Sequence, residues 1–148
     1  MAEEKMIINL KSVAERKRHY ETVFVISPSV ADAASKEISD KNAKLVSDTN
    51  GTILRQDDWG KKRMAYMIEK HAMGHYYFFR YVGTQDTVKA FERSLKLDAN
   101  ILRFQTVKLS EPLSKDEISR LVERASKEQS FAPSIRGDED DMALDGSY

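Results

Sequence analysis

A run of seven residues near the middle of the chain, Tyr76 to Val82, carries five aromatic side chains and constrains the fold more than any other feature. Aromatic and β-branched residues are enriched in β-strands. Because neighbouring side chains of a strand point to opposite faces, the run predicts a central strand that packs on both faces. Aromatic rings on a strand can also form a platform on which RNA bases stack. Packing inside a core is the simpler interpretation.

One helix is predicted before this strand in the sequence and another after it. The first is predicted over residues 30–48, after Ser29 as its N-cap. The second is predicted over residues 85–97, after Thr84 as its N-cap. Each contains an apolar stripe at helical spacing, which is typical of a helix packed on a sheet. The stripe residues are Val30, Ala34, Ile38, Leu45 and Val46 in the first helix and Val88, Phe91 and Leu95 in the second.

Three further segments have the pattern of strands, namely residues 20–26, 52–68 and 101–109. The second of them is expected to form a long hairpin with the aromatic strand, with a bulge at residues 57–60 and a turn at residues 70–74. The resulting order β-α-β-β-α-β predicts an α+β, ferredoxin-like sandwich, in which two helices cover one face of a four-stranded antiparallel sheet. The other face, or an edge, is then available to partners.

The chain divides into three parts. Residues 1–17 are a charged N-terminal extension, residues 18–110 the folded domain, and residues 111–148 a C-terminal tail. Ser114 and Glu117 form a capping-box pattern that predicts a short tail helix. Its apolar stripe either docks on a partner or folds back on its own domain, and beyond Pro133 the acidic composition predicts disorder. The stripe residues assigned to a partner are Ile118, Leu121 and Val122.

Several classes of protein are disfavoured by what the sequence lacks. It has no cysteine, so disulfides and thiolate metal sites are excluded, and a reducing cytoplasm fits. There is no apolar run of the roughly 20 residues that a membrane helix needs, and no signal-peptide pattern. Phosphate-binding glycine loops and nucleophile elbows are absent. We therefore expect no enzyme, no cofactor, no metal and no small-molecule substrate.

The histidine and aspartate pairs do not change this expectation. His71 and His75 are four residues apart, which would suit a metal on a helix, but they fall at a predicted hairpin turn. We interpret them as two exposed turn residues. Asp57 and Asp58 are adjacent, so in a regular strand they face opposite ways and make a poor acid–base pair.

The formal net charge of zero conceals an uneven distribution. Residues 51–110 contain eleven Lys and Arg against six Asp and Glu, whereas residues 138–148 contain five acids and no base. Three consecutive cations, at positions 61–63, lie between Trp59 and Tyr66, as expected of a strand that contacts phosphates. Such lysines can equally protect an edge strand from aggregation, and isolated arginines can be ordinary surface residues.

One nine-residue segment resembles a known family signature, which reads Gly, any residue, a basic residue, a polar residue, Leu, a small residue, Tyr, any residue, Ile. The corresponding segment here is Gly60–Ile68, with Met64 in place of Leu. Residues 18–21, 58–60, 75–77 and 100–103 resemble other parts of the same family in the same order. On these residues the chain resembles the sixth protein of the bacterial small ribosomal subunit. Glu69 departs from the family, which often has a basic residue there.

The resemblance implies a structural constituent of the small ribosomal subunit, in the cytoplasm, with no catalytic activity. It implies binding to the central domain of small-subunit rRNA at the subunit platform, as a heterodimer with the eighteenth small-subunit protein and near the fifteenth. We assign Tyr20, Trp59 and Tyr66 to holding the strands in place. The residues expected to contact RNA are Arg18, Lys61, Lys62, Arg63, Arg80 and Arg103.

Two other functions are compatible with the predicted fold, because fold alone does not decide function. One is a ferredoxin-like regulatory domain that binds a small molecule, and it would need a ligand pocket. The other is a cofactor-free enzyme such as a small monooxygenase, and it would need polar residues that converge inside the sheet. Phe24, Phe78 and Phe79 indicate instead that the interior is filled.

Overall fold

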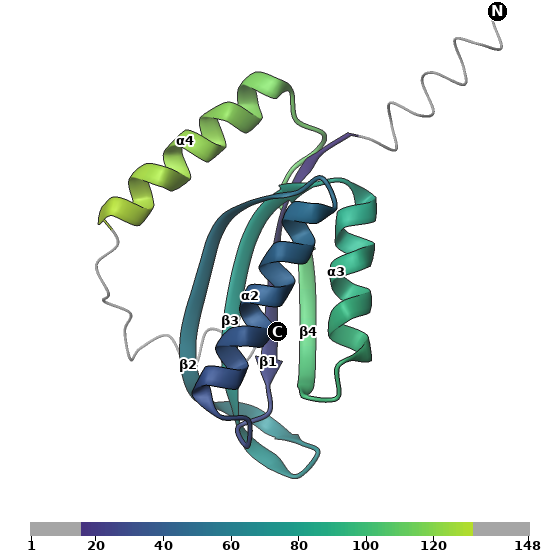
Figure 1. The fold of residues 1–148 in the computed structure, drawn as a ribbon, viewed down its shortest axis with the longest axis vertical. Helices are drawn as coiled ribbons and strands as arrows, with labels where there is room; N and C mark the ends of the chain where they lie inside the picture. Colours follow the sequence, from purple (N-terminus) through teal and green to yellow (C-terminus); the bar gives the residue numbers. More distant parts are fainter. Residues whose placement is uncertain (1–15, 132–148) are drawn as a thin grey trace, which may run out of the picture.

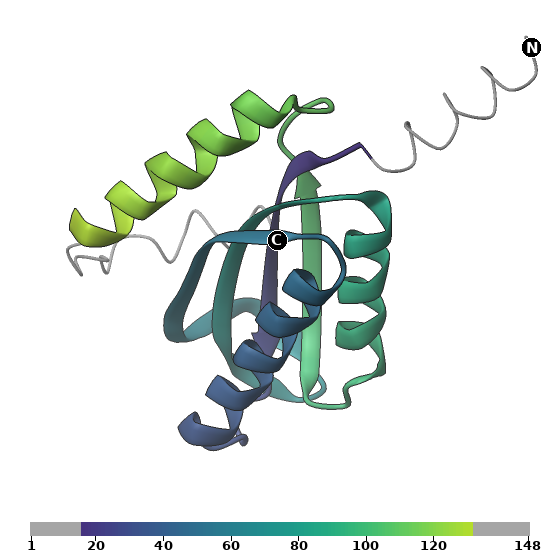
Figure 2. The same cartoon turned by 45° about the horizontal axis from the view of Figure 1, so that its top comes forward.

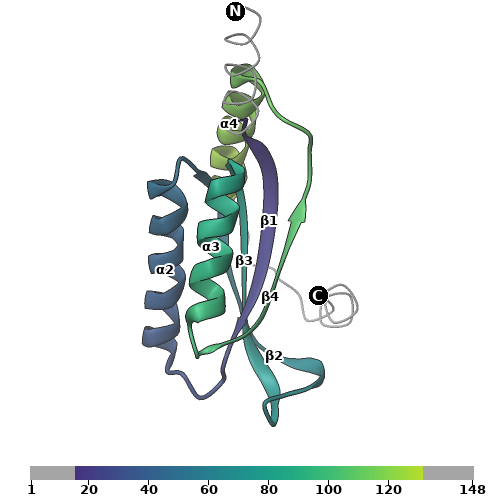
Figure 3. The same cartoon turned by 90° about the vertical axis from the view of Figure 1, so that its right-hand side faces the viewer.

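The computed structural model describes residues 16–131, and the predictions for residues 1–15 and 132–148 lie outside them. The sheet has the strand order β2-β3-β1-β4, with every neighbouring pair antiparallel. Helices α2 and α3 cover one face (Figures 1 and 3). The predicted ferredoxin-like sandwich is therefore confirmed. The elements are β1 (Arg18–Ile26), α2 (Asp32–Asp48), β2 (Thr52–Ile68), β3 (His71–Gly83), α3 (Gln85–Leu97), β4 (Ile101–Lys108) and α4 (Lys115–Phe131).

Under α2 and α3 lies an aromatic core. Phe24, Phe79 and Phe91 are fully buried, with ring centroids 5.2 to 6.0 Å apart in edge-on or tilted arrangements. Tyr81 packs edge-on against Phe91 at 5.6 Å, and its hydroxyl lies 2.9 Å from the Thr22 hydroxyl. Burial raises the pKa of Tyr81 to about 12. The aromatic run thus packs in a core, as predicted.

Helix α3 begins as predicted. The Thr84 side chain accepts a hydrogen bond from the backbone N–H of Thr87, and the Thr87 hydroxyl accepts one from the Thr84 N–H, which completes a capping box. Phe91 and Leu95 are buried on its inner face. In α3 the cap determines where the helix begins, and the apolar stripe determines which side packs on the sheet.

Helix α2 differs from the prediction at its start and on its inner face. Its N-cap is Ala31, without a side-chain hydrogen bond, and the predicted cap Ser29 contacts the Ser27 hydroxyl instead. Ala34, predicted to face the core, is exposed. At Ser35 and Ser39 the strands beneath supply hydrogen-bond partners that apolar periodicity does not reveal, whereas Asn42 bonds within α2. The residues buried on it are Ser35, Ser39, Asn42 and Val46.

The β2–β3 hairpin extends beyond the body of the sheet and curls toward the face away from α2 and α3, which we call the open face (Figure 3). Its turn is Glu69–Lys70, both with positive φ, as in the two-residue turns that connect twisted strands. The turn therefore begins before the predicted segment 70–74. The predicted bulge is confirmed by a register shift between Asp58 and Gly60. The curl lets Met64 pack with Val25 in a second apolar cluster.

Helix α4 packs along the β2 edge, on the opposite side of the sheet's width from α3 (Figures 1 and 2). The Ser114–Glu117 capping box is present, with hydrogen bonds of 3.2 and 3.3 Å. Ala125 is buried with Leu54 and Val82 on the open face. Of the two alternatives for the tail stripe, folding back on its own domain is therefore the one that is confirmed.

Candidate nucleic-acid interface

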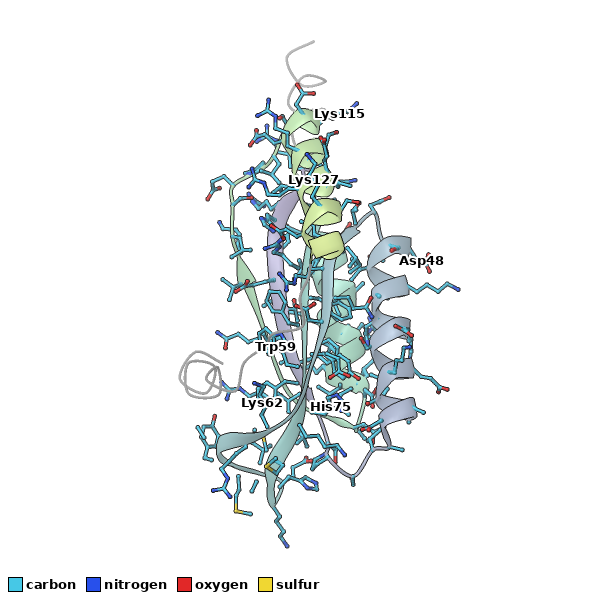
Figure 4. All side chains as sticks on the ribbon, turned by 90° about the vertical axis from the view of Figure 1, so that its left-hand side faces the viewer. Asp48, Trp59, Lys62, His75, Lys115 and Lys127 are labelled. Atoms are coloured by element: carbon cyan, nitrogen blue, oxygen red, sulfur yellow. The ribbon has the colours of Figure 1, made fainter. Side chains whose placement is uncertain are left out.

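The three consecutive cations of β2 do not share one face. Lys61 points toward α2, where its Nζ lies 3.7 Å from a carboxylate oxygen of Asp32. Strand alternation then turns Lys62 to the open face, on the side away from α2 in Figure 4. Arg63 is exposed and forms no ion pair among the described residues. The run therefore presents charge to two sides of the hairpin.

Arg80 lies on the open face but is partly neutralised by α4. Its guanidinium donates a hydrogen bond of 2.9 Å to the Glu128 carboxylate, and its Nε is buried with no hydrogen-bond partner among the described residues. Arg55 lies directly opposite Arg80 and pairs with Asp57 at 2.7 Å. Burial lowers the pKa of the neighbouring His19, and the Arg80 charge lowers it further. Through its bond to Glu128, Arg80 fastens α4 to the sheet.

Tyr66 was expected to hold the strands together, but it lies mostly in solvent. Its side chain is 61% exposed near the tip of the hairpin. The Arg103 guanidinium carbon lies 5.9 Å from the centre of its ring, and Arg103 donates a hydrogen bond of 3.4 Å to its hydroxyl. Sequence reasoning named both residues and missed the pair, because they come from β2 and β4, the two opposite edges of the sheet.

Trp59 and Tyr20 do occupy the structural positions assigned to them. Trp59 stacks on Phe78 with ring centroids 5.0 Å apart and nearly parallel planes, on the open face. Tyr20 is buried in the aromatic core and stacks on Tyr81 at 5.8 Å. Both rings therefore join a strand to its neighbours.

Arg18 lies far from the cationic hairpin. It begins β1 and pairs in register with Gly83, whereas Lys62 pairs with Gly74. These two positions are nine residues apart in β3, which corresponds to about 30 Å along the strand. The six residues predicted to bind RNA therefore do not form one site. Lys62, Arg63 and Arg103 gather at the hairpin end, with Lys61 beside them, and Arg18 lies at the other end.

His75 is not an exposed turn residue as predicted, but a buried one in β3. Its Nε2 lies 2.6 Å from the Asp58 carboxylate and its Nδ1 3.3 Å from the Ser35 hydroxyl. Its ring also stacks on Tyr77 at 4.7 Å. No sequence signal places Asp58 against it, since the bulge at Trp59 sets that register.

A serine, a histidine and an aspartate are in contact here, as in a hydrolase triad: Ser35, His75 and Asp58. The serine, however, is not accessible to a substrate. Ser35 is fully buried and its hydroxyl also contacts the Tyr77 hydroxyl at 3.2 Å, so no substrate carbonyl can approach it. Burial raises the pKa of Tyr77. The cluster is a polar network, buried at Ser35 and His75 and exposed at Asp58, that ties α2 to the hairpin.

The tail residues assigned to a partner protein divide into two groups. Ile118 and Leu121 pack on the cluster of Leu54 and Val82, so their apolar surface is largely used within the chain. Val122 remains 39% exposed. The β2 edge thus offers Ile118 and Leu121 an apolar surface that the sequence does not reveal, and their assignment to a partner stays a prediction.

Other kinds of site find little support in residues 16–131. No group of three or more His, Asp or Glu side chains there could hold a metal ion. No helix in that range has the length and apolarity to cross a bilayer. A hollow on the surface of α4 is lined by Arg120, Glu123, Arg124 and Lys127, the exposed charges of a single helix. It offers none of the mostly apolar enclosure that small-molecule pockets have.

Comparison with known proteins gives consistent results. Residues 19–108 match the family model described as Ribosomal protein S6. The chain is 37% identical over 103 residues to small ribosomal subunit protein bS6 of Trichlorobacter lovleyi, which covers 70% of this chain and 84% of that protein. It is also 37% identical over 97 residues to the bS6 protein of Moorella thermoacetica, covering 66% of this chain and 99% of that protein.

A solved structure supports the fold. The crystal structure of 30S ribosomal protein S6 from Thermotoga maritima superimposes with a TM-score of 0.61, and the match covers 80% of this chain and all of that one. The sequences are only 20% identical in that match, so the likeness concerns the arrangement of the elements.

Proposed function

We propose how this chain, which belongs to the Ribosomal protein S6 family, is held in the small ribosomal subunit. Members of this family are structural, non-enzymatic proteins of the cytoplasmic ribosome. The chain binds the central domain of small-subunit rRNA at the platform, as a heterodimer with the eighteenth small-subunit protein and close to the fifteenth. The observation that carries the RNA part of this proposal is the gathering of Lys62, Arg63 and Arg103 at the hairpin end.

These three residues are assigned to phosphate and 2′-hydroxyl groups of folded rRNA. RNA helices are recognised mainly by such contacts, because their major groove is too narrow for side chains to read. Lys61 is a weaker contact because Asp32 lies beside it. Arg18 makes a separate contact at the other end of β1. Arg80 acts indirectly, by holding Glu128 and with it α4.

The partner protein is assigned to the surface beside α4. Val122 of α4 is exposed there at 39%. Exposed apolar side chains near a polar rim are a common feature of protein interfaces. Val122 is the main direct contact to the eighteenth protein, and the partly buried Ile118 and Leu121 support it from the side that packs on β2.

The decisive test is a titration of the purified chain, alone and with the eighteenth protein, onto a central-domain rRNA fragment at several salt concentrations. A fragment from another domain of the same rRNA serves as the matched control. Binding to the central domain should weaken with salt, with a log–log slope of about −0.7 to −0.9 for each phosphate contacted. Equal affinity for both fragments, or affinity that salt does not change, would contradict the proposal.

A further inference from the structure

Two opposite edges of the sheet meet at the hairpin end. Tyr66 belongs to β2 and Arg103 to β4, which are separated in the sheet by β3 and β1. The contact forms because the hairpin curls across the open face, where Met64 packs with Val25 (Figure 3). The guanidinium carbon lies 5.9 Å from the ring centre of Tyr66. Arg103 thus holds the ring from one side.

The ring keeps a large exposed surface in spite of this contact. Tyr66 and Met67 are each 61% exposed and Met73 is 37% exposed, at the end of the hairpin that extends furthest from the core. The charged residues around them are mostly cations: Arg63, Lys70 and Arg103 stand against the single acid Glu69 within the hairpin tip. The tip therefore combines an exposed aromatic surface with positive charge.

We propose that Tyr66 is the stacking surface for one unpaired base of RNA, with Arg103 orienting the ring and Arg63 contacting the adjacent phosphate. This inference rests on the proposed function and names the chemical group that the same site recognises. Unpaired RNA bases are bound by stacking on aromatic rings and on guanidinium planes. Both surfaces are present here side by side, the Tyr66 ring exposed and Arg103 partly so.

A protein partner is the competing occupant of this surface, and the charges argue against it. Tyr, Met and Arg are also enriched at protein interfaces, so residue type alone fits either occupant, but the excess of positive charge around the ring favours a polyanion such as RNA. Here the exposed ring is bordered by cations, and one of them lies against the ring itself. That arrangement matches a base flanked by phosphates better than an apolar side chain.

The first experiment uses assembled small subunits from cells in which this chain is the only copy. Irradiation at short ultraviolet wavelength joins RNA bases to the aromatic residues on which they stack. Trypsin should then release the peptide of residues 64–70, whose single aromatic residue is Tyr66, with a nucleotide attached. Subunits with Tyr66→Ala should lose this adduct and keep the adducts formed elsewhere. A wild-type peptide without a nucleotide, or one joined to another protein, would overturn the proposal.

The second experiment measures affinity for the central-domain rRNA fragment in the presence of the eighteenth protein. Tyr66→Ala should weaken binding about 5- to 150-fold, while Tyr66→Phe, which keeps the ring, should stay within about twofold of wild type. The salt slope should not change in either variant, because stacking releases no counterions. Since the side chain is exposed, both variants should keep the wild-type melting temperature.

The outcomes separate the two proposals. If wild type binds the fragment with the expected salt dependence and Tyr66→Ala binds equally well, the stacking site is wrong and the proposed function stands. If Tyr66→Ala lowers the salt slope, the residue acts through charge placement and the stacking assignment is wrong. If wild type does not bind the fragment, the proposed function fails and the stacking site fails with it.

Discussion

The two faces of the sheet are built from the same strands and closed by different means. The face under α2 and α3 is sealed by fully buried rings such as Phe79 and Phe91. The open face is closed by the curled hairpin tip, by α4 and by ion pairs such as Arg80–Glu128. Within residues 16–131 no large ring is exposed on the first face, whereas on the second Tyr66 is largely exposed.

This difference shows how one strand can serve stability and recognition at once. In β3 the side chains of Tyr77, Phe79 and Tyr81 enter the aromatic core. Their neighbours Phe78 and Arg80 face the other way, where they contact the β2–β3 hairpin and α4. Stability should therefore depend mainly on one face, and RNA affinity mainly on the other.

The largest expected effect is on the sealed face. Phe91→Ala should lower the free energy of unfolding by about 3–5 kcal/mol, because it leaves a cavity among rigid rings. Phe78→Ala on the open face should cost only about 1–2 kcal/mol, because that ring is half-buried and packs mainly on Trp59. Urea unfolding of both variants measures the difference. Equal losses would mean that the two faces contribute alike to stability.

The second effect is a pH dependence that belongs to the sealed face. Between pH 10 and 12 the unfolded chain has released the Tyr81 proton and the folded chain has kept it, so stability falls as the pH rises. The loss attributable to this group should reach about 2 kcal/mol near pH 12. Urea unfolding at a series of pH values measures it, and Tyr81→Phe should flatten the slope. An unchanged slope in that variant would show that other groups cause it.

A third and smaller effect is expected where α4 closes the open face. Ala125→Glu places a carboxylate against Leu54 and Val82, so α4 should detach at a cost of about 1–2 kcal/mol rather than bury the charge. Limited trypsin digestion should then cleave α4 at Arg120 and Arg124 and leave the rest intact.

The matched control for this variant is Ser126→Glu, one residue further along on the exposed side of α4. It should digest like wild type. The same digestion tests whether residues 18–110 fold by themselves, since loss of the whole structure after cleavage would show that α4 is part of the folded unit.

The smallest effect on stability is expected at the cationic hairpin. Lys62→Ala with Arg63→Ala should change the free energy of unfolding by less than about 0.5 kcal/mol. It should reduce the magnitude of the salt slope for RNA binding by about 1.4, which corresponds to two phosphate contacts. The control, Lys89→Ala with Arg93→Ala, removes two exposed cations from α3 and should leave the slope unchanged. A large loss of stability would instead assign Lys62 and Arg63 to the structure.

Much of the fold was predictable because its signals are local. The Thr84 cap, the Phe91 stripe and the aromatic strand each act within a few residues, and each appears where predicted. The candidate site was predictable only in composition. The sequence identifies its cations, but Arg18 and Lys62 lie at opposite ends of the sheet.

The sequence by itself determined the order of the helices and strands and which strand is central and buried, because periodicity and capping are properties of neighbouring residues. The tertiary structure alone decided the polar face of α2, the burial of His75 and the contact between Tyr66 and Arg103. Each of these depends on a bulge, a curl or a packed edge that joins residues far apart in the chain. No local pattern encodes which distant side chain will complete a hydrogen bond or cover a ring.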